Sequence, residues 1–311
     1  MICSIAPAKV LLFGEHFVVR GKPALGLAVA VYAKACVHSG SGKIFSRQLG
    51  IVEKDSKKHA LFSALINAVY ERYGPLPSFD IYIDSDIPMA SGMGSSASIS
   101  VALTQALLTA LGADFNREDI RIIAHEAEKS VHYKPSGVDT SLATYGGLLY
   151  YKQGLFRRLN LKLPENIALI IVNTGIERST GEVVRDVLNR SERLGIIAEH
   201  IYSAGENIVE KAVKSIESED IVLLGELMTV NHGLLWSLGA SNKSCDEIVY
   251  ALINLGAYGS KLSGAGRGGI VIGLISMESA KVAQRTLNEM GYKSIIATPD
   301  YIGVRNVQSE E

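Results

Sequence analysis

The chain has 311 residues, of which 47% are hydrophobic and 20% are charged, and its formal net charge is −1. This length exceeds the size at which one hydrophobic core usually stops growing, so we expect an ordered α/β protein of two domains and exclude the disordered and fibrous classes. Because the net charge is near zero, the protein has no general positive electrostatic field that would attract nucleic acid. The sequence also lacks a basic leader and a run of about 18 apolar residues, so we expect a cytoplasmic protein without a membrane span.

Strands are predicted where apolar runs are bounded by turn residues, at residues 2–6, 9–13, 24–38, 79–83 and 147–151. Pro7 separates the first two of these runs. Apolar residues at helical spacing predict helices over residues 57–73, 95–111 and 117–131. Asn116 is a typical cap for the last helix, which breaks before Pro135. The first half is therefore expected to be a sheet with helices packed against it.

The second half follows a polar stretch at residues 152–160, in which no element is predicted. An apolar run at 167–173 comes next, so we place the domain boundary near residue 162 and predict domains at residues 1–162 and 163–311. The second domain is expected to be mostly helical, with strands near residues 258–262, 269–275 and 293–297.

Cysteine spacing offers no pattern for a cross-linked or metal-bound framework. Cys3, Cys36 and Cys245 are odd in number, widely separated and without a C-x-x-C motif. We therefore expect neither a disulfide framework nor a zinc site.

The run from Ile87 to Ser98, IPMASGMGSSAS, is the most informative stretch of the chain. Its small residues let a ligand approach the backbone, while free amides and the positive dipole end of the next helix favour phosphate. Ser95 and Ser96 add hydroxyls that either cap the helix or bind magnesium, and the run alone leaves both roles open. It predicts a nucleotide phosphate site, whose candidate contacts are Pro88, Ala90, Ser91, Gly92, Met93, Gly94, Ser95, Ser96 and Ala97.

The common nucleotide motifs do not explain this run. Residues 92–97 match the G-x-G-x-x-A spacing of a dinucleotide fingerprint, but residues 85–91 separate them from the preceding strand, and Asp114 follows a helix where a second strand is required. A second match at residues 264–269 leads into a strand, so the necessary helix is absent. The chain also lacks a G-x-x-x-x-G-K-[ST] loop and an H-R-D catalytic loop. A different phosphate-binding architecture is expected.

Three segments resemble the motifs of the GHMP kinases, namely PAKVLLFGEH at Pro7–His16, PMASGMGSSA at Pro88–Ala97 and KLSGAGRGG at Lys261–Gly269. They occur in the family's order, and the resemblance spans residues 7 to 274. It implies a two-domain fold, in which an N-terminal ribosomal-S5-like α/β domain carries the phosphate loop and a C-terminal ferredoxin-like α+β domain closes over the cleft. It also implies a kinase of small molecules that uses ATP and Mg²⁺.

The resemblance implies roles for individual residues. Ser96 and Glu128 match the family's magnesium ligands, and a hydroxyl and a carboxylate both suit that ion. Asp139 matches the catalytic base and Lys9 the lysine beside the transferring phosphoryl group, so either proton removal or charge stabilisation can assist the alcohol. The positions that match substrate contacts are Glu15, His16, Arg178, Thr180, Gly264, Ala265 and Gly266.

Outside the motif context, the same residues have ordinary structural explanations: a helix or turn cap for Ser96 or Asp139, a solvated charge for Glu128 or Lys9, a structural role for His16, and a helix start for Arg178 or Thr180. The third motif also departs from the family pattern, which has glycine where this chain has Arg267. That side chain either reaches the nucleotide phosphates or an acidic neighbour, or points into solvent.

Two further segments narrow the expected substrate. Phe17–Val19 and Pro135–Asp139 are similar to the family branch that phosphorylates the 5-hydroxyl of (R)-mevalonate, giving 5-phosphomevalonate and ADP. Kinases of phosphomevalonate and homoserine stay open as alternatives, whereas Lys9 with Asp139 argues against the mevalonate 3-kinase branch and Glu128 against the decarboxylases. A nucleotide-binding regulator is expected to have lost Lys9, Glu128 or Asp139. The resemblance further implies a homodimer, with no nucleic-acid or membrane partner.

Overall fold

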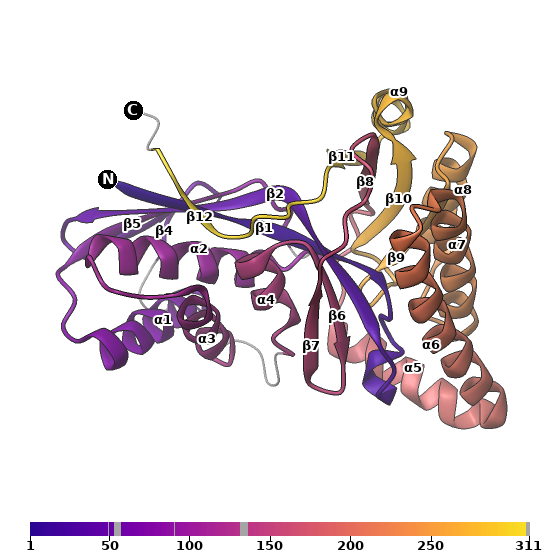
Figure 1. The fold of residues 1–311 in the computed structure, drawn as a ribbon, viewed down its shortest axis with the longest axis horizontal. Helices are drawn as coiled ribbons and strands as arrows, with labels where there is room; N and C mark the ends of the chain where they lie inside the picture. The colour runs from indigo at the N-terminus through magenta and orange to yellow at the C-terminus, as the bar shows by residue number, and fades with distance from the viewer. Residues whose placement is uncertain (49, 53–56, 90, 131–135, 309–311) are drawn as a thin grey trace.

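The computed structural model describes residues 1–48, 50–52, 57–89, 91–130 and 136–308, and it forms two sheets with helices around them (Figure 1). The strands are β1 (Ile2–Phe13), β2 (Ala24–Ser39), β3 (Ile44–Ser46), β4 (Gly50–Ile51), β5 (Phe79–Ser85), β6 (Leu148–Lys152), β7 (Leu155–Leu159), β8 (Ile167–Asn173), β9 (Gly259–Ser263), β10 (Ile270–Ser276), β11 (Lys293–Ala297) and β12 (Arg305–Val307). The helices are η1, a 3₁₀ turn (Val18–Arg20), α1 (Lys57–Tyr73), α2 (Ser95–Ala110), α3 (Arg117–Glu128), α4 (Val138–Tyr145), α5 (Thr180–Leu194), α6 (Ile196–Glu217), α7 (Ile221–Ser237), α8 (Lys243–Asn254) and α9 (Met277–Glu289).

The first sheet has the order β12-β1-β2-β5-β3-β4, and the hairpin β6-β7 joins it through β2. The prediction of two strands around Pro7 is wrong, because β1 is one continuous strand of 12 residues. Proline cannot donate a ladder hydrogen bond, and the strand accommodates it through a register shift between Pro7 and Ala8 instead of ending there. β1 can therefore pair with β2 from the N-terminus to the edge of the cleft described below.

The polar stretch at residues 152–160 is a second correction, since it contains strand β7. β6 and β7 pair as a hairpin whose two turn residues, Gln153 and Gly154, have φ of 50° and 84°. Positive φ at both positions matches the right-handed twist of paired strands. Most of β7 is exposed and it pairs with β6 at one edge, so its sequence lacks the buried alternation by which strands are recognised.

Helices α1, α2 and α3 cover one face of the first sheet (Figure 1). Asn116 caps α3 as expected, through a reciprocal capping box with Asp119. The helix ends at Glu128 and not at 131, and Pro135 lies outside the described residues. The apolar residues on one side of α3 are buried against the sheet and α2, namely Ile120, Ile123, Ala124 and Ala127.

The second sheet is antiparallel with the order β11-β8-β10-β9, and all three strands predicted in the last third of the chain are present. Its apolar face shares one core with the part of β1 and β2 that lies beyond the first helices. That core brings together residues from strands of both sheets and from helices α6 and α7, including Val10, Leu27, Leu169, Ile272, Val209 and Met228. The two sheets are therefore packed against each other, and the boundary near residue 162 stays a prediction.

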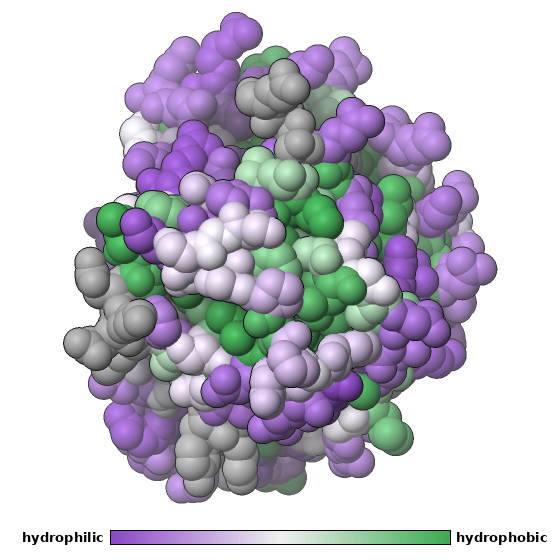
Figure 2. All heavy atoms as spheres, turned by 90° about the vertical axis from the view of Figure 1, so that its left-hand side faces the viewer, coloured by the Kyte–Doolittle hydropathy of each residue, from purple (hydrophilic) through white to green (hydrophobic). Residues whose placement is uncertain are grey.

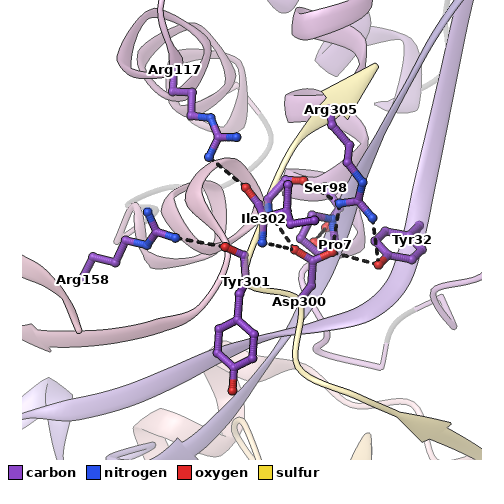
Figure 3. Close-up of polar contacts among 10 residues, drawn as sticks. Pro7, Tyr32, Ser98, Arg117, Arg158, Asp300, Tyr301, Ile302 and Arg305 are labelled. Atoms are coloured by element: carbon purple, nitrogen blue, oxygen red, sulfur yellow. Dashed lines mark hydrogen bonds and ion pairs between the residues drawn. The ribbon is translucent and has the colours of Figure 1, made fainter. Parts of the chain in front are cut away.

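After β11, the chain returns to the first sheet, where β12 pairs with the start of β1 (Figure 1). Asp300 anchors this return: its carboxylate accepts hydrogen bonds from the Tyr32 hydroxyl and from the amides of Ile302 and Gly303, at 2.7–2.9 Å, and pairs with Arg305 (Figure 3). The Val304 amide donates to the Thr144 carbonyl, at the end of α4. The C-terminal segment thus contacts the end of α4, whereas Asp139 lies in the first turn of that helix.

Cys3 and Cys36 form a disulfide between β1 and β2, which corrects the expectation that the chain has no disulfide framework. The two residues are direct partners in the strand register. A separation of 33 residues carries no signal for this contact, because the pairing of the long strands creates it. Cys245 is free and buried, and no group of three or more His, Cys, Asp or Glu in the described ranges could hold a metal.

The end of the molecule that carries β4 and β5 exposes apolar side chains. Figure 2 shows apolar residues gathered at the centre of this end and polar residues around them. A groove on β3–β5 has Phe45, Ile51 and Tyr82 in its lining, and Ile51 is 59% exposed.

Within the described parts of the chain, no helix is both long and apolar enough to cross a bilayer.

Candidate active site

A cleft of about 630 Å³ lies where β1, the loop before α2 and the start of α4 face the loop between β9 and β10. Its size is typical of sites for small molecules. The three glycine-containing segments singled out in the sequence all contribute to its wall. They are brought there by the end of β1, the start of α2 and the end of β9.

Lys9 and Asp139 form an ion pair in this cleft, with 3.1 Å between Nζ and Oδ1. Lys9 comes from β1 and is 9% exposed, while Asp139 lies in the first turn of α4, after Gly137 at the N-cap. A Cβ on Gly94 would lie 3.2 Å from Lys9 Cγ and 3.4 Å from Asp139 Oδ2. The phosphate-loop backbone therefore packs directly on the pair, as only a glycine with φ of 76° allows.

The start of α2 presents backbone amides to the cleft. Gly94 is its N-cap, and no side chain of the described residues caps the helix there. Ser95, Ser96 and Ala97 line the cleft, so the first turn offers donors and a positive dipole end to an anion. The Ser95 and Ser96 hydroxyls are thus not N-caps, which settles one of the alternatives left open by the sequence.

Ser96 and Glu128 meet at the same end of the cleft, where Ser96 Oγ donates to Glu128 Oε1 at 2.5 Å. The Ser100 hydroxyl lies 3.4 Å from the same oxygen. Glu128 is 5% exposed and comes from the last turn of α3. Mg²⁺ usually takes one or two protein oxygens and completes its shell with water and substrate phosphate, so this donor pair fits that ion.

His16 also lines the cleft and is held by the third glycine segment. Its Nε2 donates to the Ala265 carbonyl at 2.7 Å, because a carbonyl can only accept. Burial lowers the pKa of His16, so the ring is neutral at neutral pH, and Nδ1 is a buried acceptor that has no partner in the described structure. The cleft therefore offers one unsatisfied acceptor to a hydroxyl donor.

Arg178 fills the space between two glycine loops. A Cβ on Gly269 would lie 2.8 Å from its Nη2, and one on Gly92 would lie 3.1 Å away. Burial lowers the pKa of Arg178, its Nε has no partner among the described atoms, and its Nη1 lies 3.4 Å from Thr180 Oγ1. A guanidinium stays charged in proteins, so the cleft holds a cation ready for an anionic group.

Glu15 reaches the cleft wall, but its carboxylate is turned away from solvent. Its side chain and that of Lys261 are both 0% exposed and form an ion pair. Asn231 Nδ2 donates to the other Glu15 oxygen at 3.3 Å. Lys261 belongs to the third motif, but its role was not foreseen, because a lysine in an otherwise apolar strand gives no sign of its partner.

Arg267 has an acidic neighbour, which was one of its open interpretations. It forms an ion pair with Asp186 of α5 at 2.7 Å, and its Nε donates to the Gly239 carbonyl. Its φ is 53°, a backbone conformation that residues with a Cβ adopt only with strain. These contacts tie the third motif to helix α5.

Most of the candidate residues lie together in the cleft. Gly264, Ala265 and Thr180 line it with those already described. Met93 is fully buried in the core and contributes its carbonyl to the Lys9 amide, whereas a Cβ on Gly266 would lie 1.9 Å from the Ala240 carbonyl, away from the cleft. Ala90 lies outside the described residues. The sequence analysis missed several lining residues that stand outside its motifs, including His125, Thr140 and Val184.

Comparison with known proteins gives this arrangement a context. The GHMP kinases N terminal domain matches residues 60–147, and the GHMP kinases C terminal domain matches residues 212–293. The mevalonate kinase of Pyrococcus horikoshii is 36% identical over 308 residues, which cover 91% of each chain. That of Aeropyrum pernix is 36% identical over 284 residues, covering 86% of this chain and 87% of the relative.

Solved structures share the whole fold. The Methanococcus jannaschii mevalonate kinase superposes with a TM-score of 0.85 at 28% identity, covering 96% of this chain and 98% of its own. The L. major mevalonate kinase in complex with R-mevalonate superposes with a TM-score of 0.82 at 28% identity, covering 95% of each chain. The two-domain architecture expected from the three motifs is thereby confirmed.

Proposed function

The chain belongs to the mevalonate kinases of the GHMP kinase family, and we propose that the cleft described above carries out the reaction of that family. The protein is an ATP-dependent kinase that phosphorylates the 5-hydroxyl of (R)-mevalonate and releases 5-phosphomevalonate and ADP. The observation that carries the assignment to this cleft is the convergence of an ion-paired lysine and aspartate with an uncapped helix N-terminus at one wall.

Asp139 and Lys9 act on the acceptor alcohol. A primary alcohol scarcely ionises at neutral pH, so Asp139 takes the hydroxyl proton as the oxygen attacks phosphorus. Lys9 stabilises the negative charge on the attacking oxygen and on the transferring phosphoryl group. Their contact at 3.1 Å keeps both groups at one point of the cleft, so the transfer depends on positioning as much as on proton removal.

The phosphate loop binds the nucleotide. The amides of Ser95, Ser96 and Ala97 at the start of α2 receive phosphate oxygens, and Gly92 and Gly94 let them approach the backbone. Pro88 and Ser91 are the other contacts proposed for this loop, whereas Met93 is buried in the core and Ala90 lies outside the described residues. Ser96 and Glu128 would hold Mg²⁺, which supplies charge neutralisation to the phosphates when it is bound.

The opposite wall binds mevalonate. The unpartnered Nδ1 of His16 accepts a hydrogen bond from a substrate hydroxyl, and Arg178 offers N–H donors to the substrate carboxylate or to a phosphate. Thr180, Gly264 and Ala265 complete this proposed side of the site, while Glu15 lies behind its wall with both carboxylate oxygens paired and Gly266 lies away from the cleft. Each polar group of the substrate then has a partner, which is how a buried polar site rejects analogues that lack one.

Location and assembly stay predictions. We place the protein in the cytoplasm and expect the homodimer that the family resemblance implies, with no nucleic-acid or membrane partner.

A panel of acceptors tests the proposed function. Purified protein with ATP and Mg²⁺ is offered mevalonate, 5-phosphomevalonate, homoserine or galactose, and ADP release is followed by a coupled assay with an acceptor-free control. We expect ADP release above the control with mevalonate. Release only with another alcohol would assign the cleft to a different GHMP kinase, and ATP binding without release on any alcohol would favour a regulator.

A further inference from the structure

The third glycine segment and the turn after β1 are joined by a buried ion pair. Lys261 lies on β9 and Glu15 lies in the turn after β1, 246 residues apart. Both side chains are 0% exposed. Burial lowers the pKa of Lys261, whereas the Glu15 carboxylate beside it raises that pKa and favours the charged form. A buried charge requires a partner, so each group stabilises the charge of the other.

The surroundings fix this pair from two further directions. Lys261 Nζ also donates to the Leu262 carbonyl at 2.6 Å, and Asn231 of α7 donates to Glu15. The Leu262 amide in turn donates to His232 Nδ1 at 3.3 Å. Glu15 is therefore held by β9 and α7, and its two oxygens already have partners without any ligand.

His16 is the next residue after Glu15 and faces the cleft. Its own hydrogen bond goes to Ala265, four residues beyond Lys261. Two consecutive side chains of the turn are thus tied to the same glycine segment, one behind the cleft wall and one at its surface. The direction of His16 Nδ1, the acceptor offered to the substrate, depends on both attachments.

We propose that Lys261 is a positioning residue for the mevalonate side of the cleft. It neutralises and anchors Glu15, and the anchored turn holds His16 in the orientation that receives the substrate hydroxyl. Glu15 acts through the same turn and does not contact substrate. The nucleotide side is built from α2 and α3, which these contacts do not touch, so the effect is confined to the acceptor.

The primary test is Lys261→Met, which keeps the length of the side chain and removes its charge. Because a displacement of about 1 Å in a binding group can cost up to about 100-fold, we expect the KM for mevalonate to rise at least about tenfold while the KM for ATP stays within about twofold. The inference rests on mevalonate as the acceptor, so wild-type turnover is measured first. If another alcohol is the acceptor, the KM for that alcohol is measured in place of the KM for mevalonate. A failure of the proposed function is then seen in the wild type, and a failure of the role of Lys261 is seen only in the variant.

A double variant distinguishes positioning from general damage. In Glu15→Gln with Lys261→Met, neither member of the pair carries a charge, and the glutamine amide can donate to Asn231 Oδ1, which has no partner in the described structure. We expect the KM for mevalonate, which rises in Lys261→Met, to return most of the way to the wild-type value in this double variant. It also provides the measurement if Lys261→Met alone does not fold.

Arg305→Met is the matched control for lost stability. It leaves the Asp300 carboxylate, whose side chain is 2% exposed, without its cation, and neither residue lines the cleft. We expect a lower Tm with both KM values unchanged. The proposal is overturned if Lys261→Met raises both KM values alike or neither, or if the double variant folds but keeps a KM for mevalonate as high as that of Lys261→Met.

Discussion

Replacing Asp139 by asparagine lowers kcat by about 10²–10⁴-fold, the range expected when a general base is removed, while ATP still binds. Asparagine keeps the shape of the side chain but cannot accept the proton of the acceptor hydroxyl. It also withdraws the negative charge that lies 3.1 Å from Lys9 Nζ. Turnover by a coupled assay and nucleotide affinity by calorimetry measure the two effects separately.

Asp84→Asn is the control for this substitution. Asp84 also pairs with a cation, Arg47, but both side chains are exposed, at 45% and 68%, and lie outside the cleft. Exposed pairs contribute little to stability, so kcat and Tm should stay close to wild type. If Asp139→Asn retains near-normal turnover, Asp139 has no catalytic role.

Replacing Glu128 by glutamine should abolish most activity at ordinary Mg²⁺ concentrations. Glutamine keeps the hydrogen bond from Ser96 but lacks the negative charge that a hard divalent cation prefers. We expect the Mg²⁺ concentration for half-maximal turnover to rise more than about tenfold, because changes even in groups behind metal ligands cost 10–100-fold in affinity. A Mg²⁺ titration of the rate at saturating ATP measures the shift.

Glu126→Gln provides a comparison from the same helix. Glu126 lies two residues earlier on α3, where it pairs with Arg72 outside the cleft. Its removal should leave the Mg²⁺ dependence unchanged. An equal Mg²⁺ requirement in both variants would remove Glu128 from the metal site.

Local signals in the sequence predicted the parts of the fold that local interactions determine. Asn116 and Asp119 form a capping box within one turn of helix, so the start of α3 could be identified without tertiary contacts. Gly94 and the serines after it mark the phosphate loop, since only small residues permit that backbone path. β7 escaped prediction because an exposed edge strand carries no buried alternation.

Contacts between residues far apart in the chain could not be predicted from the sequence. The Cys3–Cys36 disulfide depends on the register of two long strands, and the Glu15–Lys261 pair joins the turn after β1 to β9. The three motifs predicted which segments share the cleft. They did not distinguish Glu15, whose carboxylate is turned inward, from His16, whose ring faces the substrate side.

The position of the phosphate on the product tests the account most directly. The wild-type protein is incubated with ATP, Mg²⁺ and mevalonate, and the product is examined by proton–phosphorus correlation NMR. We predict a phosphorus resonance coupled to the two protons of the C5 methylene group. A phosphoester without such coupling, as on the tertiary carbon that bears the 3-hydroxyl, would contradict the assignment of this cleft to 5-hydroxyl phosphorylation.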